Sequence, residues 1–168
     1  RKSYPAEFII AIPTDISEVE KKAFIDLVES SSMAKVKGVK VIAKPIAAAL
    51  GADLDITNAR GVMMLDIGAA TTEVAIISLG GIVISKLIPV GGDTLDESIA
   101  ANIKKKCNLL IGKKTAEYLK KRLACAYPGH DGEVKVFGRN VVTGLPQEIN
   151  VKAPLVYDAI REHLGSIV

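Results

Sequence analysis

The sequence has no tryptophan and few aromatic residues of any kind, and this scarcity argues against one class of partner. Aromatic residues make up 4% of the 168 residues. Proteins that bind single-stranded nucleic acid stack its bases on aromatic side chains. The net charge of +3 is also too small to require a polyanionic partner. We therefore expect no nucleic-acid partner.

Cysteine and long apolar runs are also lacking. The two cysteines, Cys107 and Cys125, make no disulfide framework and fit a reducing cytosol. No apolar run reaches the roughly 18 residues of a membrane span. Hydrophobic residues nonetheless amount to 49%, so we expect a globular chain with a buried core. The chain begins with Arg1 rather than methionine, and we expect it to be an excerpt of a longer polypeptide.

In the first sixty residues, short apolar runs alternate with amphipathic segments, which predicts an α/β layer. Ser17 and Glu20 have the spacing of a capping box at a helix start, and we expect that helix to bury one apolar stripe. Gly51 is the expected end of a second, shorter helix. The expected elements are a buried strand of a parallel sheet at Glu7–Pro13, a helix over 17–31, a strand at Val39–Ala43 and a helix at Ile46–Leu50.

The middle of the chain predicts three antiparallel strands in one sheet. Gly80-Gly81 is a hairpin signal between two of them. Thr94 and Glu97 predict a capping box at the start of the helix that follows. The expected strands are Val62–Asp66, Thr72–Leu79 and Ile82–Pro89. Beyond them we expect helices at Lys114–Ala124 and Tyr157–Leu164, and short strands at Glu133–Phe137, Val141–Gly144 and Glu148–Val151.

Two glycine-containing segments are candidate anion sites. In the octet from Asp66 to Glu73, an acid ends a strand and a loop of very small residues follows, which lets backbone amides approach a phosphate. The two acids could hold a hydrated Mg²⁺, although a plain hairpin explains the same octet. Gly91-Gly92-Asp93 is either a second anion site at a helix start or an ordinary N-cap. The isolated His130 and His163 are expected at the surface.

Four stretches carry a family resemblance that covers nearly the whole chain. They are LDIGAATTEVAIISLGGIV, VGGDTLDESI, NLLIGKKTAEYLKKRLACAYPG and GRNVVTGLPQEINV. Together they resemble the MreB/Mbl family of rod-shape-determining bacterial actin homologues. The DIGxxTTE pattern is shared with the wider actin, Hsp70 and sugar kinase superfamily, whereas GRNVVTGLP is particular to MreB-type proteins. The resemblance implies part of an actin-like ATPase fold (ribonuclease H-like), α/β with a mixed sheet and flanking helices.

The resemblance also implies a domain division and a nucleotide site. Residues 1–60 would be the C-terminal part of actin-like domain I, and 61–168 part of domain II, with 94–151 mostly the small subdomain IIB. ATP would bind in a cleft between the domains, and Asp66 and Glu73 would hold Mg²⁺ through water. Without the resemblance, the E-x-x-K-K pattern from Glu117 would be a solvated helix face. The implied nucleotide-contacting residues are Asp66, Gly68, Ala69, Ala70, Thr71, Thr72, Gly91, Gly92, Glu117, Lys120 and Lys121.

The chain departs from the family pattern at two places. Ala69 and Ala70 stand where the family has glycines, and each adds a Cβ and resists positive φ. Lys44 stands where the family has an acid before the proline, placed to orient the attacking water. A protonated lysine cannot be that base but could pair with phosphate. We therefore expect no catalytic residue among these positions and at most a weak ATPase.

The resemblance implies a cytoskeletal protein that assembles into filaments with bound nucleotide and determines cell shape. Its partners would be copies of itself, the cytoplasmic face of the membrane and the cell-wall synthesis machinery, and its location cytoplasmic and membrane-associated. An alternative is a non-cytoskeletal ATPase, kinase or chaperone-like member of the superfamily, against which GRNVVTGLP argues. A third is a basic nucleic-acid-binding module over 104–122, although solvation or an acidic partner surface explains that run as well.

Overall fold

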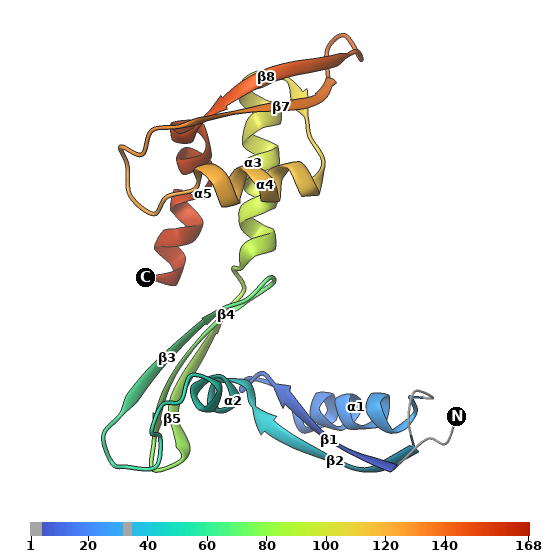
Figure 1. The fold of residues 1–168 in the computed structure, drawn as a ribbon, viewed down its shortest axis with the longest axis vertical. Coiled ribbons are helices and arrows are strands. Elements are labelled where there is room, and N and C mark those ends of the chain that lie inside the picture. The colour runs from blue at the N-terminus through green and yellow to red at the C-terminus, as the bar shows by residue number, and fades with distance from the viewer. Residues whose placement is uncertain (1–4, 32–34) are drawn as a thin grey trace. The chain divides into compact units, whose positions relative to one another are not determined.

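In the computed structural model, which describes residues 5–31 and 35–168, the chain forms two compact units (Figure 1). The first unit runs to Asp66 and also includes Glu73–Leu87. The second unit consists of Ile67–Thr72 and Ile88–Val168. The division into actin-like domains at residue 60 stays a prediction.

The first unit begins with two parallel strands, β1 (Pro5–Ile12) and β2 (Lys35–Ala43). Parallel strands need a crossover connection, which α1 (Glu18–Glu29) supplies. The predicted parallel strand is therefore confirmed, but it is not buried. β1 and β2 form a two-stranded sheet, and alternate residues of β1 face solvent, such as Ile9 with 71% exposure.

Helix α1 confirms its predicted start and contradicts its predicted burial. The side chains and backbones of Ser17 and Glu20 form the reciprocal capping box. None of the helix residues is buried, and Val19 and Leu27 are largely exposed. A two-stranded sheet is too narrow to cover a whole apolar stripe, so α1 contacts β2 with only part of that stripe.

A short helix, α2 (Lys44–Gly51), follows β2 directly. Pro45 lies in the first turn of α2 and is buried. In that turn the missing backbone N–H of proline costs no helical hydrogen bond. Gly51 is the last helical residue, as expected. The left-handed conformation that follows the helix belongs instead to Asp53, with φ of 55°.

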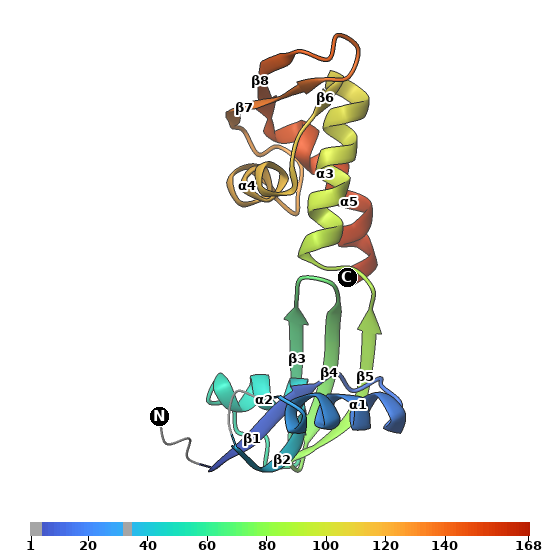
Figure 2. The ribbon, with the colours of Figure 1, turned by 90° about the vertical axis from the view of Figure 1, so that its right-hand side faces the viewer.

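The three expected strands of the middle segment form one sheet, in the order β3-β4-β5. Figure 2 shows β3 and β5 pointing the same way on either side of β4. The tight turn lies one residue earlier than predicted, because Leu79 and Gly80 both have positive φ, 52° and 74°. Gly81 already belongs to the next strand. The strands are β3 (Val62–Ile67), β4 (Thr72–Ser78) and β5 (Gly81–Ile88).

The second unit packs three helices against a small antiparallel sheet of order β6-β7-β8 (Figure 1). Helix α3 starts at Gly92 with Gly91 as its N-cap, so the predicted Thr94–Glu97 capping box is wrong. Helix α5 starts four residues earlier than predicted. The elements are α3 (Gly92–Cys107), β6 (Leu109–Leu110), α4 (Lys113–Leu123), β7 (Glu133–Asn140), β8 (Pro146–Lys152) and α5 (Ala153–Ile167).

The turn between β7 and β8 replaces the strand predicted at Val141–Gly144. Asn140 accepts the amides of Val142 and Thr143 through its side-chain oxygen, at 2.8 and 3.0 Å. Side-chain capping of this kind favours a turn over a strand. Pro146 does not interrupt the next strand but begins it.

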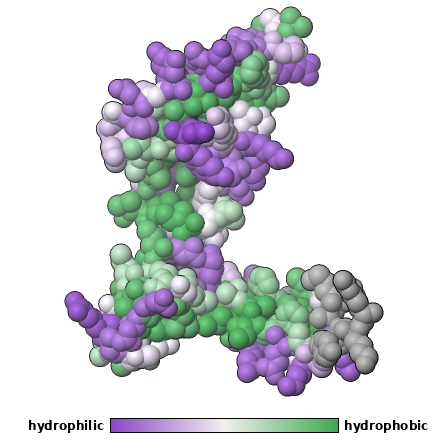
Figure 3. Space-filling view, viewed as in Figure 1, coloured by the Kyte–Doolittle hydropathy of each residue, from purple (hydrophilic) through white to green (hydrophobic). Residues whose placement is uncertain are grey.

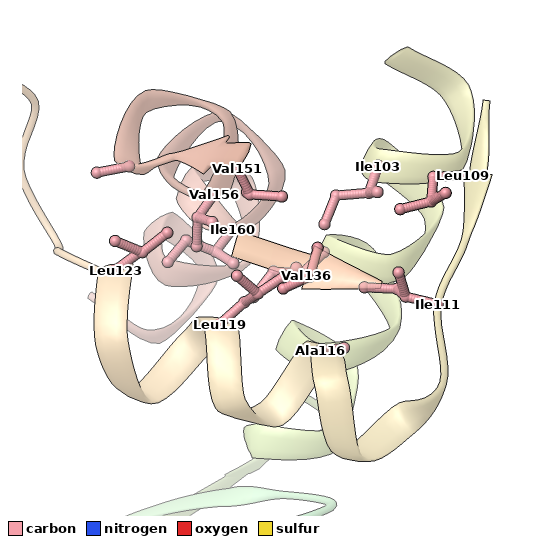
Figure 4. Packing of buried hydrophobic residues seen from close by; sticks show 12 residues of the cluster. Ile103, Leu109, Ile111, Ala116, Leu119, Leu123, Val136, Val151, Val156 and Ile160 are labelled. Carbon is pink, nitrogen blue, oxygen red and sulfur yellow. The ribbon is translucent and has the colours of Figure 1, made fainter. Parts of the chain in front are cut away.

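The core of the second unit lies between its helices and its sheet (Figure 4). It contains Ile99 and Ile103 of α3, with apolar side chains of α4, α5 and all three strands. His130 is exposed, as predicted. His163 is not isolated, because it is partly buried and its Nε2 lies 2.7 Å from the Ser98 hydroxyl. That hydroxyl also donates to the carbonyl of Thr94, at 2.9 Å.

The first unit has a smaller buried cluster of Ala49, Ile56 and Ile77. The first unit also exposes many large apolar side chains. This apolar surface appears green in Figure 3 over the region that α2, β1 and α1 occupy in Figure 1. The described helices include none that is both long and apolar enough to cross a bilayer.

Candidate functional site

The loop at 68–71 joins β3 to β4 and has unsatisfied backbone donors. The amide of Gly68 donates to the Thr71 carbonyl at 2.9 Å and closes the loop. The amides of Ala69, Ala70 and Thr71 have no acceptor among the residues that the structure describes. Ala69 and Ala70 are exposed. Consecutive free amides in one turn form a concavity suited to an anion.

The two alanines of this loop fit without backbone strain. Neither Ala69 nor Ala70 has a positive φ. The loop therefore does not require the left-handed conformations that favour glycine, and the Cβ atoms of Ala69 and Ala70 meet no such penalty.

The predicted glycine pair at the start of α3 packs against the same loop, within the second unit. The Gly92 amide donates to the Gly68 carbonyl at 2.9 Å, and the Asp93 amide to the Ala69 carbonyl at 2.8 Å. A Cβ on Gly91 would lie 2.5 Å from the Ala69 oxygen. The loop carbonyls therefore cap α3, and the first amides of this helix are not free for a phosphate in this structure.

Thr72 fastens the loop to the segment that precedes α3. Its side chain is fully buried, and its hydroxyl donates to the Val90 carbonyl at 2.8 Å. A threonine hydroxyl has one proton to donate. Thr72 thus holds the loop in place rather than offering a free donor, whereas Thr71 stays partly exposed.

The three predicted residues of α4 have two different environments. Lys120 turns inward, where its ammonium lies 2.9 Å from the Asp96 carboxylate and donates to the Gly92 carbonyl at 2.8 Å. Glu117 and Lys121 pair with each other on the surface at 2.6 Å. This contact lowers the pKa of the Glu117 carboxyl and raises that of the Lys121 amine.

Within the first unit, Lys44 and Asp66 form an ion pair. The Lys44 Nζ lies 2.8 Å from Asp66 Oδ2. The side chains keep 35% and 25% of their surface exposed. Lys44 opens α2 and Asp66 stands near the end of β3, so this pair joins two elements of the unit.

Glu73, at the start of β4, is buried with 2% exposure. Its Oε1 accepts hydrogen bonds from the amide of Thr14, at 2.9 Å, and from the Thr14 hydroxyl. Its Oε2 has no partner among the described residues. A buried carboxylate oxygen without a partner is costly, and a water or a hydrated cation would satisfy it.

Thr14 also lines a surface cleft of about 410 Å³ in the first unit. The cleft opens at the carboxyl ends of the parallel strands β1 and β2, where Ile12 and Ala43 line it. Ligands of α/β proteins bind beside such strand ends. Thr14 thus both lines the cleft and donates hydrogen bonds to the buried Glu73.

The family model for the MreB/Mbl protein matches residues 1–168. The chain belongs to the MreB/Mbl family. It is 38% identical to the cell shape-determining protein MreB of Escherichia coli (strain K12), over 95% of the chain and 46% of that protein. It is 40% identical to the cell shape-determining protein Mbl of Bacillus subtilis (strain 168), over 95% and 47%. The chain thus spans about half the length of the curated relatives it matches.

Solved structures confirm the actin-like fold of this MreB/Mbl chain. MreB 5 of Spiroplasma citri bound to AMPPNP superposes with a TM-score of 0.87 at 32% identity, over 95% of the chain and 47% of that structure. The ADP-bound form gives 0.89 at 31%, over 96% and 48%. The MamK double helical filament, at 20% identity and a TM-score of 0.73 over 97% and 47%, supports the fold alone.

Two residues that contact predicted site residues of this MreB/Mbl chain, Asp96 and Thr14, were not predicted from the sequence. Asp96 is 3% exposed and holds Lys120. Its position on the face of Ile99 and Ile103, three and seven residues further along α3, was an available signal, because an acid on an apolar face needs a partner. Thr14 gave no signal, because its partner is 59 residues away.

Proposed function

We propose that this chain is part of a cytoskeletal MreB-type actin homologue that binds ATP and assembles into filaments to determine cell shape. Family membership and the names of the relatives support this. The related MreB 5 structures, which contain AMPPNP or ADP, support nucleotide as the ligand.

The observation that carries the proposal is the set of free amides at Ala69, Ala70 and Thr71. Phosphate oxygens accept hydrogen bonds from such amides, and each charge-assisted bond is worth roughly 1.5–3 kcal/mol. Gly91 and Gly92 support the loop from behind. Lys120 supports it indirectly, through the Gly92 carbonyl.

The surface pair of Glu117 and Lys121 remains available for the adenosine. Both side chains keep a large exposed surface, 45% and 69%, so that a ligand could reach them from solvent. Its role in nucleotide binding rests on the family resemblance.

We propose that Mg²⁺ accompanies ATP. The two acids expected to hold it, Asp66 and Glu73, do not suit the metal equally well. Glu73 has an unpartnered oxygen that suits a metal-bound water. Asp66 already faces the ammonium of Lys44. Among the described residues, no group of three or more His, Cys, Asp or Glu side chains is placed to hold a metal. When present, Mg²⁺ would neutralise phosphate charge.

The remaining parts of the proposal concern the whole protein. Residues 1–60 would complete domain I and 61–168 would supply part of domain II, with 94–151 as subdomain IIB. The protein would act in the cytoplasm at the membrane face, with itself and the cell-wall synthesis machinery as partners. These assignments rest on the family resemblance.

The test uses the full-length gene product and an Ala70→Asp variant. Ala70 is exposed, so aspartate costs no packing but places a negative charge beside the free amides. We expect at least a tenfold loss of affinity for a fluorescent ATP analogue, and loss of nucleotide-dependent sedimentation. Ala126→Asp, also in an exposed loop, is the matched control and should bind as wild type does. Equal binding by Ala70→Asp and wild type would refute the site.

A further inference from the structure

Among the described residues, the ion-pair partner of Asp66 is the side chain of Lys44. The 2.8 Å contact between Nζ and Oδ2 is a direct charge-assisted hydrogen bond. Both backbones are held in regular elements, since Lys44 opens α2 beside the buried Pro45, and Asp66 lies in β3. Rigid elements at both ends favour a persistent pair.

A divalent ion at Asp66 would compete with this ammonium. Mg²⁺ binds through carboxylate oxygens that keep their full negative charge. The Lys44 ammonium already contacts Oδ2 and offsets part of that charge, and it would repel a second cation at the same carboxylate. Asp66 therefore does not fit the role of a metal acid that the family resemblance implies.

We infer that Lys44 takes the place of the divalent cation at Asp66, so that nucleotide binding depends little on Mg²⁺ even where Glu73 holds a metal-bound water. The inference rests on the proposed function. An ammonium has three donors, of which one is directed at Asp66. The others have no acceptor among the described residues and could donate to an oxygen of a phosphate, for which lysine is a suitable point charge. Asp66 lies two residues before Gly68, the first residue of the proposed phosphate loop.

Binding of a fluorescent ATP analogue by the full-length gene product tests the inference without reference to hydrolysis. Affinity is measured in excess Mg²⁺ and in excess EDTA. We expect the wild-type affinities to agree within about threefold. Lys44→Glu places a second carboxylate beside Asp66. For this variant, the affinity in Mg²⁺ should exceed the affinity in EDTA by more than tenfold. Lys40→Glu is the matched control. Lys40 is exposed on β2, so this substitution makes the same change of charge away from Asp66.

A second variant separates a metal ligand from the partner of a lysine. Asp66→Asn keeps the shape of the side chain and frees Lys44. If Lys44 replaces the metal, this variant binds the analogue in EDTA at least as tightly as wild type. If Asp66 is instead a metal ligand, its affinity in Mg²⁺ falls tenfold or more, and the inference is wrong.

The outcomes distinguish this inference from the proposed function. The wild-type protein could bind the analogue in Mg²⁺ and show a more than tenfold lower affinity in EDTA. That result would overturn the role of Lys44 and leave the nucleotide site intact. A wild-type protein that binds in neither condition overturns both. Circular dichroism and thermal unfolding of each variant confirm that the fold is retained.

Discussion

Gly91 lies directly against the carbonyl group of Ala69, so close that a Cβ atom there would be 2.5 Å from its oxygen and 2.7 Å from the Gly68 oxygen. The φ of Gly91 is −155°, which any residue can adopt. Contact with the loop, rather than backbone conformation, therefore requires glycine at this position.

Gly91→Ala should displace the phosphate loop. Overpacking of this kind costs typically 1–3 kcal/mol, and nucleotide affinity should fall with it. Urea unfolding and titration with an ATP analogue measure the two effects. Gly112→Ala is the matched control, because Gly112 is the N-cap of α4 and its Cβ would meet nothing within 4 Å. The explanation fails if the two variants lose the same stability.

Lys120→Met should destabilise the second unit by leaving the buried Asp96 without a counter-charge. Removing one partner of a buried pair costs about 3–5 kcal/mol, and we expect the lower end because Lys120 keeps 20% exposure. Adding Asp96→Leu should restore most of the loss in urea unfolding. Lys121→Met, next to it on the surface, should change stability little. If the double variant is as unstable as the single one, Asp96 is not the reason.

Lys44 should make the full-length protein a slow ATPase. Attack on the γ-phosphate needs a group that orients water and accepts its proton, which is worth typically 10²–10⁴-fold, and an ammonium offers donors only. The Lys44 ammonium also engages the Asp66 carboxylate. Phosphate release by Lys44→Glu at saturating Mg-ATP should be at least tenfold faster, whereas Lys40→Glu should match wild type. A wild type as fast as Lys44→Glu would contradict this.

Acid should weaken the start of α1. The hydrogen bonds from Ser17 lower the pKa of the Glu20 carboxyl. The folded state therefore binds this proton more weakly than the unfolded state, so the charged form stabilises folding above pH about 4.3, the usual value. That contribution is lost as the pH falls through the lower, folded value.

The measurement compares wild type with Glu20→Gln by thermal unfolding from pH 7 to pH 3. The variant should be less stable at pH 7, and the difference should vanish at the acid end. Glu29→Gln, at the other end of α1, is the control and should not lose stability, because a negative charge at a helix C-terminus is unfavourable. A difference independent of pH would show that the charge of Glu20 does not contribute.

Local signals in the sequence predicted the family and most of the order of elements, apart from β6 and the strand expected at Val141–Gly144. The Ser17–Glu20 capping box, Pro45 in a first turn and the small residues of the 68–71 loop act over a few residues, so their outcome can be predicted without the rest of the chain. The same local reasoning misplaced the start of α3, because loop carbonyls cap it from more than twenty residues upstream.

Only the tertiary structure decided which polar and charged side chains from distant parts of the sequence meet. Lys44 and Asp66 are 22 residues apart in sequence and Thr14 and Glu73 are 59 apart, and no periodicity relates either pair. The buried stripe predicted for α1 failed for the same reason, since burial depends on what covers a helix and not on its own pattern. The residue types at the site are readable from the sequence, whereas their pairing depends on contacts that folding alone brings together.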